Sequence, residues 1–231
     1  MKKIGFLIFA AALVVGLVVS NLFSFGRIKG EFFSFSFGGV HGSGNSTSER
    51  RDVTGFHGIE VGGVYQVEVT AQQDFSVTVE ADDNLVPLIR TEVDGGILRI
   101  VSDKRISPKS VIRIVIAAPD IDDLNVSGAA NVTVSDIKNA GLSIDASGAS
   151  KVTVNGETEK LTVDVSGAMR VDAVDLAAVN ATVGASGASQ VTVNVSGDLR
   201  TSASGASRIT YAGSPKNVTK KTSGASSVSP K

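Results

Sequence analysis

The chain has 231 residues, enough for one elongated domain behind a targeting segment or for two small domains. Its formal net charge of −1 gives no electrostatic reason to expect nucleic acid or an anionic membrane surface as a partner. Cysteine is absent and only two histidines occur, which excludes disulfides, thiolate zinc sites, cysteine nucleophiles and a cysteine-linked lipid anchor. Histidine-based metal or acid–base sites have little material, so no cofactor or metal is expected.

Residues 1–25 have the layout of an export segment. Met1-Lys2-Lys3 is a short basic region, and the sixteen residues from Ile4 to Val19 carry no charge. Cleavage after Ser20 would make the segment a signal peptide, whereas an apolar span continuing to Phe25 is long enough to cross a bilayer. Both interpretations place the rest of the chain outside the cytoplasm. A buried helix of a cytoplasmic core is disfavoured, because nothing downstream is helical enough to pack on it.

Residues 26–50 are expected to connect this segment to the folded part. Phenylalanines first cluster in the sequence EFFSFSFGG (31–39), which suits a bilayer interface or the seal of the first domain layer. From Gly38 to Ser48 the chain is rich in Gly, Ser, Asn and Thr, which predicts a flexible tether. The folded part is expected to begin near Arg51, and 51–231 to form one continuous domain.

Residues 51–123 predict strands of irregular length. The sequence GIEVGGVYQVEVTA (58–71) alternates until Gly62-Gly63, where a bulge or kink is expected. FSVTVEA (75–81) and SVIRIVIAA (110–118) also alternate, and GGILRIVS (95–102) predicts the return strand of a hairpin. Only Asn84 to Glu92 is compatible with a short helix, which Pro87 limits. We interpret this region as irregular first turns or a cap closing one end of a solenoid.

Residues 124–231 contain a repeat of about nineteen residues. A Ser-Gly-Ala motif followed by an alternating strand occurs six times, and its serines are separated by 20, 19, 20, 18 and 19 residues. A period that tolerates one-residue slips is typical of a solenoid whose turns accept loop insertions. The predicted structural corners are Ser127-Gly128, Ser147-Gly148, Ser166-Gly167, Ser186-Gly187, Ser204-Gly205 and Ser223-Gly224.

Each repeat predicts a strand, a corner, a second strand and a variable connection. Glycine at the corner permits a positive φ, and the alanine beside it leaves room for the neighbouring turn. One turn buries too little apolar surface to fold alone, so the turns must stack. The predicted fold is therefore all-β, a right-handed parallel β-helix or β-solenoid. A β-sandwich of repeated hairpins remains the alternative, because the segments halfway through each repeat contain some turn residues.

Several stretches together resemble a known bacterial family. They are RDVTGFHGIEVGGVYQVEV (51–69), NLVPLIRTEVDGGILRIV (84–101), IDDLNVSGAANVTV (121–134) and the serial SGAS corners. This combination resembles the family called "putative auto-transporter adhesin, head GIN domain", over about Arg51 to Val228. The resemblance implies an exported β-solenoid, and it supplies no catalytic residues to carry over.

The outward positions after the corners form a candidate ligand stripe. Its members are Lys151, Arg170, Gln190 and Arg208, in the same column as Asn131 and beside a column of mostly threonines. The stripe could bind an acidic polysaccharide, but we favour the other interpretation, a solvated face kept soluble by charge. Asp145 and Asp164 on the preceding strands are expected to neutralise Lys151 and Arg170, which favours the solvated face.

Enzymatic sites have weak support. A polysaccharide lyase or hydrolase needs clustered carboxylates or a calcium site, and the only dense acidic stretches are Asp120-Ile-Asp-Asp123 and Asp82-Asp-Asn84. Neither has the ligand spacing of a calcium loop, so both are interpreted as turns. Ser-Gly-Ala is not a nucleophile elbow, because five of the six motifs lack the glycine two places before the serine.

The sequence thus predicts an exported, non-enzymatic β-solenoid that acts as an adhesion or interaction module of the bacterial cell envelope. A periplasmic structural or accessory protein is the alternative, and a polysaccharide-acting enzyme comes third. The expected partners are the membrane, through the N-terminal segment, and an envelope protein, a host ligand or a polysaccharide. Only SSVSPK follows the last corner, so an open solenoid end is expected, and exposed strand edges there favour self-association.

Overall fold

The computed structural model describes residues 39–231, in which nearly all regular structure is β-strand. The predicted export segment and the phenylalanine cluster up to Phe37 lie outside the described residues. Within the described part, no helix combines the length and the hydrophobicity needed to cross a membrane.

The elements are β1 (Val40–His41), β2 (Ser46–Arg51), β3 (Gly58–Gly63), β4 (Gln66–Thr70), β5 (Ser76–Asp82), the 3₁₀ helix η1 (Val86–Leu88), β6 (Ile89–Asp94), β7 (Ile97–Ser102), β8 (Ile106–Ser107), β9 (Arg113–Ala117), β10 (Asp123–Gly128), β11 (Asn131–Gly148), β12 (Lys151–Gly167), β13 (Arg170–Ala185), β14 (Gln190–Val195), β15 (Asp198–Ala203), β16 (Arg208–Gly213), β17 (Asn217–Thr222) and β18 (Ser227–Pro230).

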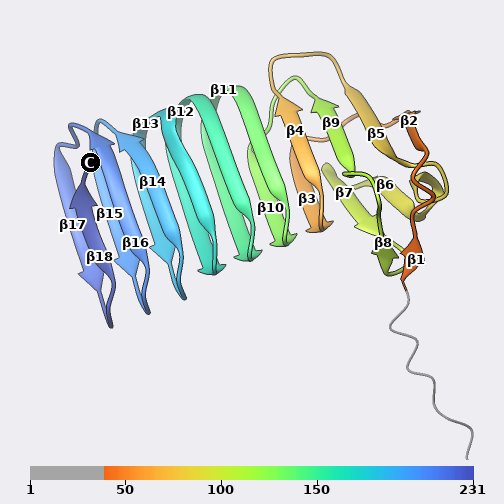
Figure 1. Cartoon of the computed structure of the whole chain (residues 1–231). Helices are drawn as coiled ribbons and strands as arrows, with labels where there is room; N and C mark the ends of the chain where they lie inside the picture. The colour runs from red at the N-terminus through yellow and green to blue at the C-terminus, as the bar shows by residue number, and fades with distance from the viewer. Residues whose placement is uncertain (1–38) are drawn as a thin grey trace, which may run out of the picture. The chain divides into compact units, whose positions relative to one another are not determined.

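The repeats stack as coils of a β-solenoid of about five turns (Figure 1). Each strand from β10 onward pairs in parallel with the strand one repeat later, so Val152 lies beside Val132 on one side and Val171 on the other. A sandwich of hairpins would need antiparallel pairs between neighbouring repeat strands, and these pairs are parallel. The solenoid prediction is therefore confirmed.

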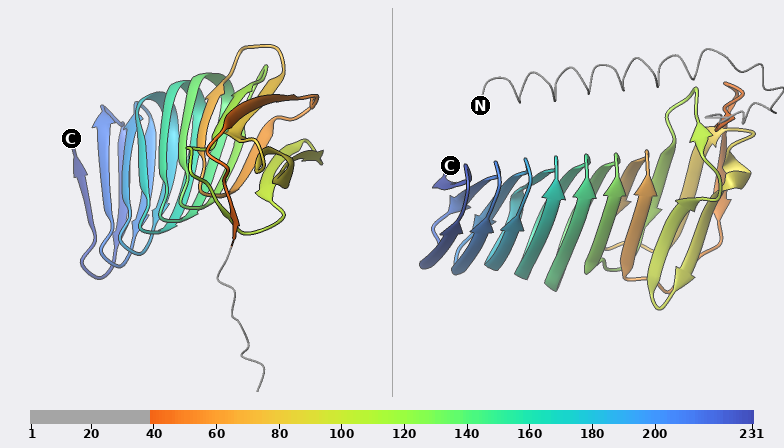
Figure 2. Two further views of the ribbon diagram at one scale, coloured as in Figure 1. Left: turned by 45° about the vertical axis from the view of Figure 1, so that its right-hand side comes forward. Right: turned by 90° about the horizontal axis from the view of Figure 1, so that it is seen from below.

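Each coil has two faces joined by its Ser-Gly-Ala corner (Figure 2). We call the surface built by the strand segments before the corners the pre-corner face, and the surface built by the segments after them the post-corner face. Alternate side chains of both faces are buried in one continuous core, as Ile144 and Val152 show on either side of a corner. The intervening side chains point to solvent, and the register places equivalent outward residues of successive coils in ladders.

The corners fit together only because their central residue is glycine. Gly148 has φ = +101°, and a Cβ atom there would collide with the carbonyl oxygen of Gly128 in the previous coil. That same oxygen accepts a hydrogen bond from the Ala149 N–H at 2.8 Å and from the Ser150 hydroxyl at 3.1 Å. The close approach of the two backbones and these hydrogen bonds depend on each other.

The region from 51 to 123, interpreted as irregular first turns or a cap, contains two coils whose bounds the sequence did not show. β3 and β4 pair in parallel with β10 and β11, and Gly63 takes the place of the corner glycine next to Gly128. β7 and β9 add a further coil on the other side of β3 and β4. The bulge expected at Gly62-Gly63 is thus a solenoid corner. The sequence hides this coil because Gly63-Val64 replaces Gly-Ala and because residues 71–122 intervene before the next coil.

The remaining N-terminal elements close this end of the solenoid. β6 pairs antiparallel with β7, as the predicted hairpin requires, while β5 and then β2 extend the sheet from β9. The stretch from Asn84 to Glu92, compatible with a short helix by sequence, forms only a 3₁₀ turn at Val86–Leu88, and Ile89–Asp94 is strand β6. Pairing with β7 supplies backbone hydrogen bonds that a short helix interrupted by Pro87 lacks.

The flexible tether predicted from Gly38 to Ser48 is also corrected. Val40–His41 pairs with β8, and Ser46–Arg51 pairs antiparallel with β5. The loop between them is held by Asp82, whose buried carboxylate accepts hydrogen bonds from the Gly44, Lys109 and Ser110 backbone N–H groups and from the Ser110 hydroxyl. These contacts join segments tens of residues apart, so local composition could not reveal them.

Replacing Gly148 by alanine should destabilise the solenoid by at least about 2 kcal/mol, because the side chain would occupy a left-handed conformation and strike the Gly128 carbonyl. Gly141→Ala is the matched control, since a Cβ there would meet only the Lys160 carbonyl at an ordinary 3.8 Å. Equilibrium unfolding in urea, followed by circular dichroism, measures both effects. Equal midpoints for the two variants would contradict the packing of the corner.

Asp82 should make the fold sensitive to acid. Burial alone would raise its pKa, but the hydrogen bonds from Lys109, Ser110 and Gly44 outweigh burial and hold the pKa below its ordinary value. The ionised form therefore stabilises the folded state at neutral pH, and this contribution disappears as the pH falls from about 4, the unfolded-state pKa, through the folded-state value.

The Asp82→Asn variant should be less stable at pH 7 and should lose less of its remaining stability in acid than the unmodified protein. Asp74→Asn, at an exposed position in the loop before β5, is the control. Thermal unfolding between pH 3 and pH 7 measures the difference. Parallel stability curves for the Asp82→Asn variant and the unmodified protein would show that this carboxylate does not cause the acid sensitivity.

Candidate functional site

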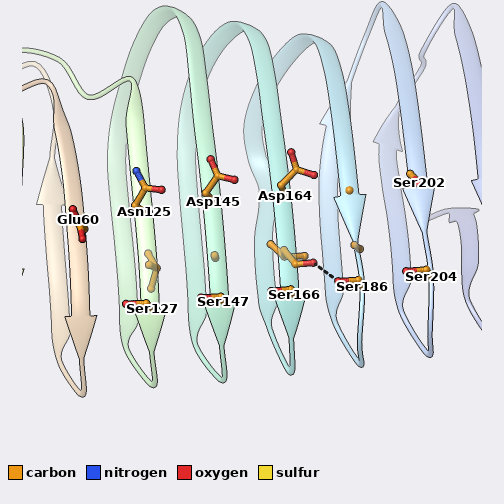
Figure 3. A pocket seen from close by; sticks show the side chains of 15 residues that line it. Glu60, Asn125, Ser127, Asp145, Ser147, Asp164, Ser166, Ser186, Ser202 and Ser204 are labelled. Atoms are coloured by element: carbon orange, nitrogen blue, oxygen red, sulfur yellow. Dashed lines mark hydrogen bonds between the residues drawn. The ribbon is translucent and has the colours of Figure 1, made fainter.

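A groove of about 810 Å³ runs along the pre-corner face (Figure 3). It crosses six successive pre-corner strand segments, β3, β10, the ends of β11, β12 and β13, and β15. Two ladders of outward side chains line most of it. One ladder contains Ser127, Ser147, Ser166, Ser186 and Ser204, and the other contains Glu60, Asn125, Asp145, Asp164, Gly184 and Ser202.

The hollow exists because these outward positions hold short side chains. The register places Gly184 beside Asp164, so the ladder of carboxylates ends where a residue without a side chain begins. Ser202 follows in the next coil. The core-facing neighbours are small as well, since Ala146 and Ala185 lie where Val126 and Val165 lie in other coils. The groove floor is therefore formed by backbone, hydroxyl groups and methyl groups.

Two carboxylates stand side by side in the groove. Asp145 and Asp164 occupy paired positions on β11 and β12, and both are exposed (Figure 3). Partial burial and the neighbouring Asp145 charge raise the pKa of Asp164 above its ordinary value. Partial burial likewise raises the pKa of Asp123, and the negative charges of Asp145 and Asp122 add to this effect. Asp123 lies on β10, two residues before the groove residue Asn125. The groove therefore has a negative potential that favours a cationic or hydrogen-bond-donating ligand.

The serine ladder supplies hydroxyl groups at the spacing of the coils. Ser127 and Ser186 donate to the carbonyl oxygens of Val61 and Val165 at 3.3 and 3.4 Å, which orients their lone pairs outward. Ser147 and Ser166 between them are exposed. Together with the carboxylates, this row can form hydrogen bonds with an extended polar ligand along the solenoid axis.

The post-corner face carries the predicted stripe. The structure places Lys151, Arg170, Gln190 and Arg208 in one ladder in consecutive register, and all four are exposed. The neighbouring ladder contains Thr133, Thr153, Asp172, Thr192 and Thr210. The geometry makes a straight row of cationic and amide groups.

One expectation about this stripe is wrong. Among residues 39–231, no ion pair joins Asp145 or Asp164 to Lys151 or Arg170. The Ser-Gly-Ala corner lies between each aspartate and the following cation and turns them onto different faces. Most ion pairs of the described chain join residues of the N-terminal elements, for example Arg113 with Glu68 and Arg99 with Glu60.

The other acidic stretches have structural roles. Asp120 accepts hydrogen bonds from the Ile121 N–H and the Asn139 amide, while Asp122 contacts His57 Nδ1 at 2.7 Å. This hydrogen bond, then the Asp122 charge, raises the pKa of His57. Within residues 39–231, no group of three or more potential ligands is arranged to bind a metal ion.

Comparisons with known proteins agree with this architecture. The family described as "Putative auto-transporter adhesin, head GIN domain" matches residues 55–215. The chain belongs to this family. A search of curated protein sequences gave no match.

Two solved structures show the same fold at low sequence identity. A "putative adhesin" from Bacteroides fragilis superposes with a TM-score of 0.69 and 18% identity, covering 84% of this chain and all of the other. A "putative lipid binding protein" from Parabacteroides distasonis gives a TM-score of 0.51 and 19% identity, covering 83% of this chain and 99% of the other. Both structures therefore share the solenoid fold of this chain.

Sequence reasoning missed the groove, although a signal was present. An aspartate stands two residues before the corner serine in two consecutive repeats, at Asp145 and Asp164, and the next repeat has Gly184 there. When short charged side chains in one outward ladder are followed by a glycine, the ladder indicates a hollow in the surface. It could be interpreted only after the pre-corner and post-corner ladders had been assigned to different faces.

Removing the Asp145 carboxylate should remove the repulsion that raises the pKa of Asp164. In an Asp145→Asn variant, the pKa of Asp164 should fall towards its ordinary value, because the neighbouring negative charge is gone. A raised carboxyl pKa makes the folded state lose stability as the pH rises through that pKa, so the variant should gain up to about 0.5 kcal/mol at pH 7.

An NMR titration of the aspartate carboxyl carbons measures the pKa, and urea unfolding measures the stability. Asn125→Asp provides the opposite test, because it adds a third carboxylate to the ladder and should raise the pKa of Asp164 further. Asp172→Asn on the other face is the control. An Asp164 pKa unaffected by both pre-corner variants would contradict the coupling along the ladder.

Proposed function

We propose that this protein is an exported, non-enzymatic interaction module of the adhesion type in the bacterial cell envelope. The observation that carries the proposal is the pair of regular faces on one stacked solenoid, each with an exposed polar ladder in consistent register. A surface of this kind presents the same chemistry once per coil, which suits binding to an extended or repetitive ligand. Membership of the head GIN family and the adhesin-type fold support the same function.

The arrangement of polar groups supports binding more than catalysis. Asp145 and Asp164, the nearest pair of carboxylates in the groove, lie beside serines and glycines with no histidine among the lining residues. Glycoside hydrolysis needs an acid and a base that differ in protonation and flank one bond, whereas these two carboxylates stand on the same side of an open groove. The basic ladder lies on the other face, so it cannot assist them.

A periplasmic structural or accessory role is the second candidate. The observation that favours it is the length of the apolar segment, since Ile4 to Phe25 is long enough to remain in the membrane as an anchor. An anchored solenoid in the periplasm would act on other envelope components instead of external surfaces. The two functions differ in one measurable property, which is access from outside an intact cell.

Labelling of intact cells separates the two candidates. The natural chain has no cysteine, so a Gln73→Cys variant carries a single thiol on the exposed loop before β5, away from both ladders. We expect a membrane-impermeant maleimide to label this thiol on intact cells. Labelling is preferable to proteolysis because stacked coils expose few flexible segments to a protease.

A periplasmic protein and a cytoplasmic protein, each with one exposed cysteine, are the controls for leakage. Labelling that requires opening of the outer layer would exclude the adhesion function and leave the periplasmic one. The mature N-terminus should be sequenced from the same sample. A start at Asn21 would indicate signal cleavage after Ser20, whereas retention of Met1 or Lys2 would indicate an uncleaved anchor.

A further inference from the structure

The two faces of the solenoid carry opposite charges at the same coils. The groove presents Asp145 and Asp164, and the cations that follow them across the corner are Lys151 and Arg170. None of these four residues forms an ion pair within the described part of the chain. In the preceding coil the corresponding outward residues, Asn125 and Asn131, are both neutral. In the two coils that contain Asp145 and Asp164, charge on one face is therefore matched with opposite charge on the other.

The two faces also differ in shape. The groove is lined by serine, glycine and alanine beside the carboxylates, so it is hollow. The post-corner ladder has long exposed side chains, Lys151, Arg170, Gln190 and Arg208, which protrude from their strands. Long cationic side chains of this kind fit a shallow acidic groove. Their axial spacing fits as well, because both ladders are set by the same distance between hydrogen-bonded strands.

We propose that a second copy of this chain docks side by side, with the basic ladder of one copy in the acidic groove of its neighbour. Lys151 and Arg170 of one copy then approach Asp145 and Asp164 of the next, with the two solenoid axes aligned. The contact relieves the repulsion between the paired aspartates, which nothing on their own face offsets. This proposal goes beyond the proposed adhesion function and does not require it.

The geometry of such a contact has a consequence for assembly. Each copy uses two different surfaces, so the contact is heterologous and leaves a free groove at one side of the pair and a free ladder at the other. Further copies can add in the same way and form a row. Each exposed ion pair contributes little and is weakened by salt, so the association depends on several pairs acting together.

Cysteine crosslinking of the full-length protein in detergent tests the proposal. Two chains of different tag size carry single cysteines, Ser166→Cys in the groove and Thr153→Cys on the post-corner face. With a short bis-maleimide, the mixture should give at least about tenfold more crosslinked dimer than either variant alone, because groove meets ladder in a heterologous contact. Gln73→Cys replaces Thr153→Cys in the control mixture and should give only background. Raised salt should reduce the specific product.

Charge reversal makes the test decisive. Lys151→Glu with Arg170→Glu on the Thr153→Cys chain should reduce crosslinking about tenfold. Asp145→Lys with Asp164→Lys on the Ser166→Cys partner should then restore it. Restored crosslinking also shows that the variant with Lys151→Glu and Arg170→Glu is folded. The circular dichroism spectrum of each variant provides an independent check.

Three results would overturn the proposal. The first is equal crosslinking of the single variants and the mixture, and the second is crosslinking that is insensitive to charge reversal. The third is an absence of crosslinks while the anionic glycan polygalacturonate binds and Lys151→Glu with Arg170→Glu removes that binding, which would assign the basic ladder to a glycan. Labelling of Gln73→Cys on intact cells is unaffected by any of these results, so the adhesion function and self-docking can fail separately.

Discussion

Each of the six Ser-Gly-Ala corners depends on the hydrogen bond that its alanine N–H donates to the corner glycine carbonyl of the previous coil. The bond from Ala149 to Gly128 and the bond from Ala168 to Gly148 are both 2.8 Å long. They form only because no side chain separates the two glycine backbones. Since each coil buries too little to fold alone, this contact fixes the register and allows the interiors of neighbouring coils to join into one core.

Strict register has an electrostatic consequence as well as a structural one. Identical outward positions of successive coils are stacked, so Asp145 meets Asp164 and Lys151 meets Arg170. Like charges at paired positions of neighbouring strands repel each other, which costs stability on both faces. The corner prevents relief within one chain because it separates the aspartates from the cations. A partner of opposite charge, whether a ligand or another copy, gains from this unrelieved repulsion.

The N-terminal part shows how the solenoid is closed at one end. The coil formed by β7 and β9 lies outside the coil formed by β3 and β4, although it follows it in sequence. Antiparallel strands β6, β5 and β2 then cover the outer strands, and the buried Asp82 fixes the loops around them. At the other end, Lys220 occupies a core-facing register position beside Thr201 and lies over the Tyr211 ring at 5.0 Å. An inward lysine on a strand disfavours pairing with a further strand.

The sequence by itself determined the repeat, the corner residues and the side chains that point outward in each coil. These features are local, because a glycine with positive φ and the alternation of a strand depend on neighbouring residues only. The tertiary structure decided that Gly63 is a corner, that Ser46–Arg51 is a strand, and that Asp145 and Lys151 stand on different faces. It also decided that the serine and aspartate ladders enclose a groove. Some of these features depend on pairing between segments far apart in the chain, and the others depend on how a corner turns the strand that follows it. A local sequence pattern encodes neither the long-range pairing nor the direction of the turn.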